Sequence, residues 1–189
     1  MPAKRPPTPL SRERIIDAAL HIADGQGLRR LTMRRLGDAL QVEAMAIYHH
    51  LPRGKEALMD ALAEHVTAVQ VEPREAPWQE IARDWARAAR AALMEHPGVL
   101  SLALTKPPKG TALMSVASQV EQLRDAGLDQ PQEAVQTLRA YVYGAVAVEM
   151  QASGWADPDA EVEKARVASG DADFERGLTA VLAGLALPK

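Results

Sequence analysis

The fold is decided by the stretch LTMRRLGDALQVEAMAIYHHLPRGKEALMDAL, residues 31–62. Thr32 is a helix-capping residue, and the apolar residues that follow it recur at helical spacing over about two turns. A second short helix is predicted over residues 44–50, and it must end there because the residue before Pro52 avoids the helical region. The stretch therefore predicts two short helices joined by a tight turn.

The second of these helices carries two adjacent histidines, and the helical geometry limits what they can do. At about 100° per residue, Ile47 marks the inner face, Met45 and His49 point away from it, and His50 leans back toward the protein. The two histidine side chains therefore diverge by about 100° and cannot easily hold one ion together. Because further ligands at the usual spacing are also missing, no metal site is predicted.

The outward side of the same helix is suited to contact another molecule. Two short helices joined by a tight turn form a helix-turn-helix, whose second helix can enter a DNA major groove. Cations on either side would meet phosphates. The outward residues are Met45, Ala46, Tyr48 and His49, and the flanking cations are Lys4, Arg5, Arg12, Arg34, Arg35, Arg53 and Lys55.

The stretch 31–62 also resembles the DNA-binding region of the tetracycline-repressor (TetR) family, including its Tyr-x-His-hydrophobic ending and the lysine that opens the next helix. The segment SRERIIDAAL, residues 11–20, is similar to the first helix of that family. More weakly, residues 76–99 and 173–185 resemble the ligand-binding and dimerising region of the branch that includes the tetracycline repressor. The resemblance implies a DNA-binding transcriptional regulator.

The resemblance also assigns roles to single residues, namely the DNA-binding set Arg34, Ala44, Met45, Ala46, Tyr48, His49 and Lys55. Tyr48 and Lys55 look like phosphate contacts, and the others look like groove-facing residues. Arginine can pair with guanine through two hydrogen bonds, whereas methionine and alanine can only pack against a thymine methyl. Alternatives stay open, since Tyr48 could be a packing residue, Arg35 a solvated helix residue and His50 a core or interhelix contact.

Two residues depart from the family pattern. Gln41 stands where glycine is usual, at a turn position that is expected to need a positive φ. Gly37 stands where alanine is usual, which lowers the local helix propensity but leaves room for a close approach of the second helix. One extra residue between Leu51 and Lys55 leaves the placement of Lys55 open.

Charge is distributed unevenly along the 189 residues. Residues 1–55 hold ten Lys or Arg against five Asp or Glu, whereas residues 56–189 hold twelve against twenty. A basic front on an acidic body suits a protein whose front meets a polyanion, although a chance fluctuation on a solvated surface is the alternative. The absence of cysteine removes disulfides and thiol chemistry, and no signal peptide or long apolar run is found. These features predict a cytoplasmic protein.

Strand signals are nearly absent, so the sequence predicts an all-α protein of about nine helices. Three parts are predicted. They are a flexible basic arm (1–9), an N-terminal three-helix domain that binds DNA through a helix-turn-helix (10–72), and a helical ligand-binding and dimerisation domain (73–189). In the last of these, helices are predicted over residues 78–95, 98–105, 110–127, 131–153 and 172–187. Residues 154–170 are predicted to be a loop with at most one short helical piece, because Gly154, Pro158 and Gly170 interrupt the pattern.

The last two long helices are expected to hold a homodimer on double-stranded operator DNA. Residues 140–150 are apolar nearly all round, which indicates burial from more than one side. In the final helix Phe174, Leu178, Val181 and Leu185 form one stripe, and Gly177 and Gly184 leave room for a close neighbour. Together these helices could form a four-helix bundle across a two-fold axis.

A small-molecule effector is implied by the resemblance, and its candidate pocket residues are Trp85, Met94, Leu102, Met114, Tyr141, Glu149 and Met150. The same stripe could be plain core. Glu149 needs a partner, which could be a residue of this chain, a residue across the dimer, or a cationic or metal-bound effector. His65 and His96 are open in the same way. No cofactor, catalytic residue or set of tetracycline or magnesium ligands is identified, and the alternative function is a regulator whose body only dimerises or binds a protein.

Overall fold

The computed structural model describes residues 9–153 and 162–186, and all regular elements within these ranges are helical. The predicted all-α class is therefore confirmed. The predicted basic arm lies almost entirely outside the described residues. The elements are α1 (Arg12–Gln26), η1 (Leu28–Arg30), α2 (Met33–Leu40), α3 (Ala44–His50), α4 (Lys55–Thr67), α5 (Trp78–Glu95), η2 (Pro97–Val99), α6 (Leu100–Thr105), α7 (Gly110–Asp125), α8 (Pro131–Ser153) and α9 (Val162–Leu185), where η marks a short 3-10 helix.

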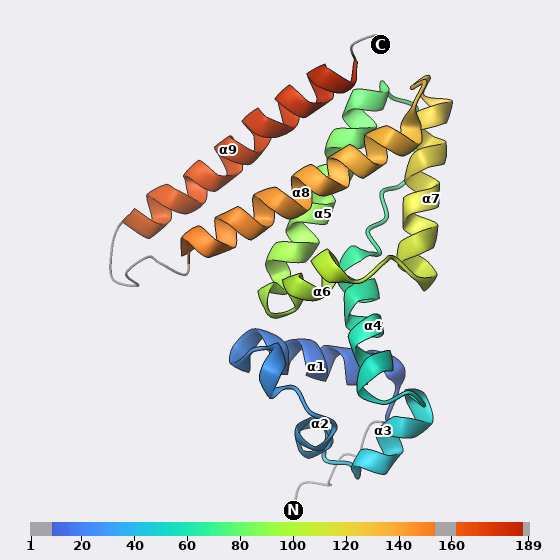
Figure 1. The fold of residues 1–189 in the computed structure, drawn as a ribbon, viewed down its shortest axis with the longest axis vertical. Coiled ribbons are helices and arrows are strands. Elements are labelled where there is room, and N and C mark those ends of the chain that lie inside the picture. The colour runs from blue at the N-terminus through green and yellow to red at the C-terminus, as the bar shows by residue number, and fades with distance from the viewer. Residues whose placement is uncertain (1–8, 154–161, 187–189) are drawn as a thin grey trace, which may run out of the picture.

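The helices form a small N-terminal group and a larger body that are linked by α4 (Figure 1). Helices α1, α2 and α3 lie at one end of the molecule, and α4 runs from them toward the body. In the body α5, α7 and α8 pack together, and α9 lies along α8. The predicted bounds of the helices over residues 44–50, 78–95 and 131–153 agree with the structure.

Helix α9 begins ten residues before the predicted start at residue 172, so the predicted loop over residues 154–170 is wrong from Val162 onward. Gly170 was interpreted as a helix breaker, but it lies inside the helix. A Cβ added to it would lie 2.5 Å from Oε1 of Glu149, so the glycine leaves space for that carboxylate. Residues 154–161 lie outside the described residues.

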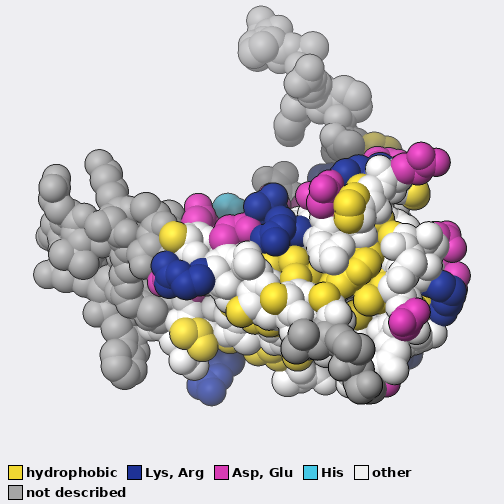
Figure 2. All heavy atoms as spheres, turned by 90° about the horizontal axis from the view of Figure 1, so that it is seen from above, with side chains coloured by type: hydrophobic (Ala, Val, Ile, Leu, Met, Phe, Trp, Pro, Cys, Tyr) yellow, Lys and Arg dark blue, Asp and Glu magenta, His cyan; other side chains and the backbone are white. Residues whose placement is uncertain are grey.

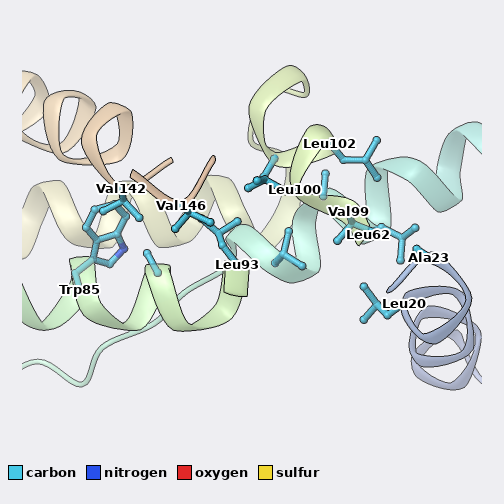
Figure 3. Packing of buried hydrophobic residues seen from close by; sticks show 14 of the residues in the cluster. Leu20, Ala23, Leu62, Trp85, Leu93, Val99, Leu100, Leu102, Val142 and Val146 are labelled. Carbon is cyan, nitrogen blue, oxygen red and sulfur yellow. The ribbon is translucent and has the colours of Figure 1, made fainter. Parts of the chain in front are cut away.

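The buried hydrophobic residues form one cluster that extends from α1 to α9. Figure 3 shows part of it, from Leu20 and Ala23 of α1 through Val99 of η2 to Trp85 of α5. The cluster therefore crosses residue 72, where the sequence predicts the domain boundary. The N-terminal helices and the body therefore share one packed core rather than having two separate ones.

The first helix meets the body through an unusually close backbone contact. A Cβ on Gly98 of η2 would overlap the backbone carbonyl of Ala23 in α1. The Gly98 amide donates to Oδ1 of Asp24 at 2.8 Å, and Nδ1 of His96 lies 2.9 Å from Oδ2 of the same carboxylate. The His96 ring in turn meets the edge of His65 on α4. Within the described residues, His96 thus holds a structural contact between the N-terminal helices and the body.

The outer surface of the body also carries hydrophobic side chains. Figure 2 looks down on the end of the body that is uppermost in Figure 1 and shows hydrophobic side chains between acidic and basic ones. The most exposed large hydrophobic residues of the body are Leu104, Leu113, Met114 and Val148. Apolar atoms make up much of any folded protein's surface, so single exposed hydrophobic residues need no special explanation.

The contact at Gly98 predicts a specific stability effect. Gly98→Ala places a methyl group against the backbone of α1, and we expect it to lower the free energy of unfolding by about 1–3 kcal/mol. Gly25→Ala in α1 is the matched control, because a Cβ there has nothing within 4 Å. That change is expected to raise the free energy of unfolding by about 0.5–1 kcal/mol. Urea denaturation of both variants measures the difference, and equal stabilities would contradict this account.

Candidate nucleic-acid interface and cavity

The turn between α2 and α3 is built from the two residues that depart from the family pattern. Gln41 adopts the left-handed conformation with φ 56° and ψ 42°, as the sequence predicts. A Cβ on Gly37 would lie 2.8 Å from the carbonyl oxygen of Val42 and 3.4 Å from the backbone nitrogen of Ala44. Gly37 therefore allows α2 and the start of α3 to lie in close contact. Thr32 caps α2 by accepting from the backbone N–H of Arg35 at 3.2 Å.

Helix α3 presents one side to solvent and anchors the other in the core. Ile47 is fully buried, whereas Met45 is 70% exposed and Tyr48 39% exposed. His49 is also exposed, and Ala44 and Ala46 are half-buried. The sequence-predicted inner and outer faces of α3 are therefore placed correctly for these residues.

Tyr48 is held in place by the turn that precedes α4. Gly54 has a φ of 56°, and a Cβ added to it would lie 2.7 Å from Cε1 of Tyr48. The ring therefore lies directly over this glycine while its remaining edge stays exposed. Lys55 opens α4 beside it and is exposed, so the phenol and the ammonium group share one side of the molecule. Both structural packing and an outward contact are compatible with this position of Tyr48.

His50 is exposed, so it is not a core residue, whereas the alternative of an interhelix contact stays open because His50 lies near Glu13 of α1. It is the last residue of a helix of seven residues, and the chain leaves the helix at Leu51. The wheel gives the direction of a side chain around its own helix, but whether another element covers that direction depends on the tertiary structure. Among the described residues, no group of three or more His, Cys, Asp or Glu side chains could hold a metal ion.

Cations near α2 and α3 differ from those of the body in their ion pairs. Within the described residues, five cations of the N-terminal helices make no ion pair with Asp or Glu, and these are Arg29, Arg30, Arg34, Arg35 and Lys55. Arg12 and Arg53 do have acidic neighbours. Among the body cations whose side chains the structure describes, by contrast, Arg139 is the exception, and the others are paired. Within the part of the chain that the structure describes, cations without an ion pair are therefore concentrated in η1, α2 and the start of α4.

Helix α4 is fixed to the body by two acidic side chains. Asp60 accepts from Nζ of Lys106 at 2.5 Å and from Nζ of Lys109 at 3.0 Å. These two lysines lower the pKa of Asp60 to about 2 from an ordinary 3.8. Glu64 accepts from the backbone N–H of Thr111 at 2.7 Å and from its hydroxyl at 2.8 Å. Glu64 thus caps the N-terminus of α7 from a neighbouring helix.

A cavity of about 260 Å³ lies in the body beside this junction. Its walls come from the segment that follows α4 and from α5, α7 and α8. Four polar side chains of α7 line it, and three of them, Ser115, Gln119 and Gln122, also tie the wall segment to α7. Ser115 donates to the carbonyl of Val69, and Nε2 of Gln122 lies 3.5 Å from the carbonyl of Val71. The four are Ser115, Ser118, Gln119 and Gln122.

Two of the seven predicted pocket residues, Trp85 and Met114, line this cavity. Met94 and Met150 are partly buried against the hydrophobic cluster, and Leu102 is part of its interior. Hydrophobic character and helical spacing are shared by core and cavity residues, so the sequence could not separate the two. Whether any of these residues contacts an effector stays a prediction.

Glu149 and Tyr141, two further predicted pocket residues, have partners within the chain. Glu149 is bound by Arg90 through hydrogen bonds from Nη2 and Nε at 2.8–3.2 Å. Tyr141 donates to the carbonyl of Phe174 at 2.6 Å, and its burial raises the pKa of the phenol. A Cβ on Gly177 would overlap the Tyr141 ring, so that glycine accommodates a neighbour from the same chain. Glu149 therefore joins α8 to α5, and Tyr141 joins α8 to α9.

The polar row of α7 was missed by the sequence interpretation. Ser115, Gln119 and Gln122 stand at positions i, i+4 and i+7 and share one helix face with the buried Ala112. A polar stripe on a face that must be buried is a signal for a lined cavity or a side-chain network. That signal was present in the sequence, but it could not show that Val69 and Val71 supply the acceptors.

Comparison with known proteins agrees with this geometry. The family model for bacterial regulatory proteins of the tetR family matches residues 15–62, and the model for the tetracyclin repressor-like C-terminal domain matches residues 72–170. The chain belongs to the tetR family. This is a family of transcriptional regulators rather than enzymes, in agreement with the sequence interpretation.

Relatives of this tetR-family chain include named repressors. The repressor DrrR1 of Streptomyces coeruleorubidus is 31% identical over 150 residues, which cover 76% of this chain and 55% of that protein. The class C tetracycline repressor of Escherichia coli is 30% identical over 203 residues, covering 93% of this chain and 90% of that repressor. A TetR variant from Acinetobacter baumannii AYE, solved in complex with minocycline, matches with a TM-score of 0.71 and 26% identity, over 93% of this chain and 96% of that one.

In the described part of this tetR-family chain, the helices are all too short or too polar to cross a membrane.

The paired state of Asp60 predicts a pH-dependent contribution to stability. Because its folded-state pKa lies near 2, below the ordinary 3.8, its contribution is complete above about pH 5 and is lost as the pH falls toward 2. Asp60→Asn should lower the free energy of unfolding at neutral pH by about 1.5–3 kcal/mol. The difference from wild type should stay constant down to about pH 5 and narrow below pH 4. Urea denaturation at several pH values measures it.

The exposed Asp17 of α1 offers the matched control for this measurement. Asp17→Asn removes one carboxylate from the surface and should leave the free energy of unfolding within about 0.5 kcal/mol of wild type. An Asp60→Asn variant that is as stable as this control would show that the two lysines do not hold α4.

Proposed function

We propose that this chain is a homodimeric transcriptional repressor that acts in the cytoplasm on a palindromic operator and is released by a small molecule. Residues 10–72 bind DNA, and residues 73–189 dimerise and bind the effector. The observation that carries the proposal is the group of cations without acidic partners around the exposed face of α3. Positive charge that pairs with no carboxylate among the described residues is available to DNA phosphates.

The side chains on this face suit a major groove. Arg34 is exposed at the start of α2 and can pair with guanine, whereas Met45 and Ala46 can only pack against thymine methyl groups. Tyr48 and Lys55 lie at the edge of the face, where phosphates are expected. Few hydrogen-bonding groups reach the bases, so the shape of the DNA is expected to contribute to specificity.

A second copy of the chain is the proposed partner of α8 and α9. Helix α8 exposes Ala140, Gly144 and Val148, which stand four residues apart on one face. Helix α9 exposes Ala180 and Gly184 in the same manner, and a Cβ on Gly184 has nothing within 4 Å. Small residues on both helices allow close approach of two further helices, and a dimer would present two recognition helices about 34 Å apart.

The cavity is placed so that its occupant can act on α4. Its wall includes Val69 and Val71, which directly follow α4, and that segment is tied to α7 by Ser115 and Gln122. A ligand that enlarges the cavity moves this segment relative to α7. Because Asp60 and Glu64 fix α4 to the α7 end of the body, the strain reaches the DNA-binding helices. Release from DNA requires that the ligand bind the displaced arrangement more tightly.

Operator binding is predicted to depend on Arg34 and on the hydroxyl of Tyr48. DNA selected from a random pool by the wild-type protein should contain a palindrome, and Arg34→Ala and Tyr48→Ala should each abolish gel-shift binding to it. Tyr48→Phe keeps the ring over Gly54 but removes the phosphate contact, so it should weaken binding at least about fivefold, for a loss of about 1 kcal/mol or more. Arg176→Ala on α9 is the control that should bind normally. Unchanged binding by the α2 and α3 variants would refute these roles.

Dimerisation is predicted to depend on the small residues of α8 and α9. The wild-type protein should sediment as a dimer at micromolar concentration. Gly184→Arg adds a large charged side chain to an open position of α9, so it should give a folded monomer that no longer binds the palindrome. Gly25→Arg, at an equally open position of α1, is the control and should remain dimeric. A wild-type monomer would argue strongly against the proposed dimer.

A further inference from the structure

A groove on the outside of the body combines an apolar wall with a cation that has no acidic partner. It lies between α6, α7 and α8 and has a volume of about 410 Å³. We propose that this groove binds a small organic monocarboxylate, whose carboxylate pairs with the guanidinium of Arg139 and whose apolar body covers the wall. The inference goes beyond the proposed function, because it concerns a different site from the cavity beside α7 and its test needs no DNA.

Arg139 is the exception to the pairing of charges in the body. Among the body cations whose side chains the structure describes, it is the one without an ion pair. Lys106 also lines the groove, but its ammonium group is bound to Asp60 at 2.5 Å. None of the described residues that line the groove is Asp or Glu. An anion in the groove would therefore meet one uncompensated positive charge and no carboxylate.

The guanidinium of Arg139 is fixed in position but still has accessible donors. Its Nη2 donates to the hydroxyl of Tyr143 at 3.3 Å, and its Cζ lies 5.5 Å from the centre of the Tyr143 ring. Tyr143 stands one turn later on α8 and lines the same groove. Nε and Nη1 of Arg139 make no hydrogen bond within the described residues, yet neither atom is shielded from solvent. These N–H groups are therefore available to a carboxylate.

The rest of the wall is mainly apolar. Val116 and Val120 stand four residues apart on one face of α7, and Val135 of α8 lines the groove with them. Leu104 of α6 also lines it and is 49% exposed. Covering apolar surface contributes about 25 cal/mol per Å². A carboxylate with an apolar body therefore gains affinity from this wall, whereas a short carboxylate does not.

The charges of the wall limit the ligand to one carboxylate. Because Asp60 already neutralises Lys106, a second carboxylate would find no free cation among the described lining residues. A positively charged group would be repelled by Arg139. Removing an unpaired charge from water is unfavourable. The ligand therefore carries a single negative charge, at the end that meets Arg139.

A second copy of the chain is the competing occupant of the groove. Ala140 lines the groove and also belongs to the α8 face that is proposed for dimerisation. The exposed residues of that face, Ala140, Gly144 and Val148, carry no charge, so they offer no carboxylate to the guanidinium. Charge complementarity therefore favours a small anion.

The test compares the affinities of straight-chain compounds for the full-length protein by isothermal titration calorimetry. Octanoate should bind about three- to tenfold more tightly than octanamide, because only the carboxylate forms charge-assisted hydrogen bonds with Arg139. It should bind at least about tenfold more tightly than butyrate, which has a shorter apolar body. Suberate, which adds a second carboxylate to the same chain length, and octylammonium should both bind more weakly than octanoate.

Two variants separate the contribution of the cation from that of the wall. Arg139→Gln should give octanoate and octanamide equal affinities, whereas Arg176→Gln, which removes the same charge from α9 outside the groove, should keep the preference for octanoate. Val120→Thr keeps the shape of the wall but adds a hydroxyl, so it should weaken both compounds and leave their ratio unchanged. Val181→Thr on α9 is its matched control and should bind both compounds as the wild type does. Ratios within one variant are not imitated by a general loss of stability.

Several outcomes would overturn the inference. They are binding of octanamide or octylammonium as tight as that of octanoate, a retained preference in Arg139→Gln, unchanged affinities in Val120→Thr, and no binding of octanoate at millimolar concentration. A ligand in the cavity beside α7 would be recognised by the retained preference, because Arg139 does not line that cavity. Binding of octanoate to the Gly184→Arg variant but not to the wild type would show that a second copy covers the groove, which also overturns the inference.

Discussion

The attachment of α4 to the body is the constraint on which the rest of the structure depends. Its apolar side carries the buried Leu58, Leu62 and Val66, and its polar side carries Asp60 and Glu64, which bind the α6–α7 connection and the start of α7. One helix therefore belongs to the core of both halves of the molecule. The N-terminal helices are held in position relative to the body because α4 cannot shift without breaking charged hydrogen bonds or opening packed core.

The distribution of charge also differs between the two halves of the molecule. In the body, acidic residues neutralise most described cations, as when Glu175 binds both Arg83 and Arg87, so that part of the surface carries little uncompensated positive charge. Among the described residues, Arg34 and Arg35 of α2 and Lys55 at the start of α4 lack such partners. A uniformly basic protein would bind polyanions on all sides, whereas this arrangement favours one orientation on a duplex. The low pKa of Asp60 results from its hydrogen bonds with Lys106 and Lys109 of the body.

Much of the fold could be predicted from the sequence, because its signals are local. The caps at Ser11 and Thr32, the proline after α3 and the apolar spacing of α5 and α8 act within a few residues, and the corresponding helices were placed correctly. The left-handed turn at Gln41 was predicted for the same reason. Gly170 shows the limit: a glycine inside a helix and a glycine that ends one look alike until its neighbour, here Glu149, is known.

The sequence by itself determined the helical class, the helix-turn-helix and the outward side of α3, since each depends on the periodicity and capping of one short segment. Only the tertiary structure decided which side chains line the cavity, that His50 is exposed, and that Glu149 binds Arg90. These facts depend on residues far apart in the chain. Ser115 is the clearest case, because its hydroxyl donates to the Val69 carbonyl, forty-six positions earlier, which no pattern around Ser115 contains.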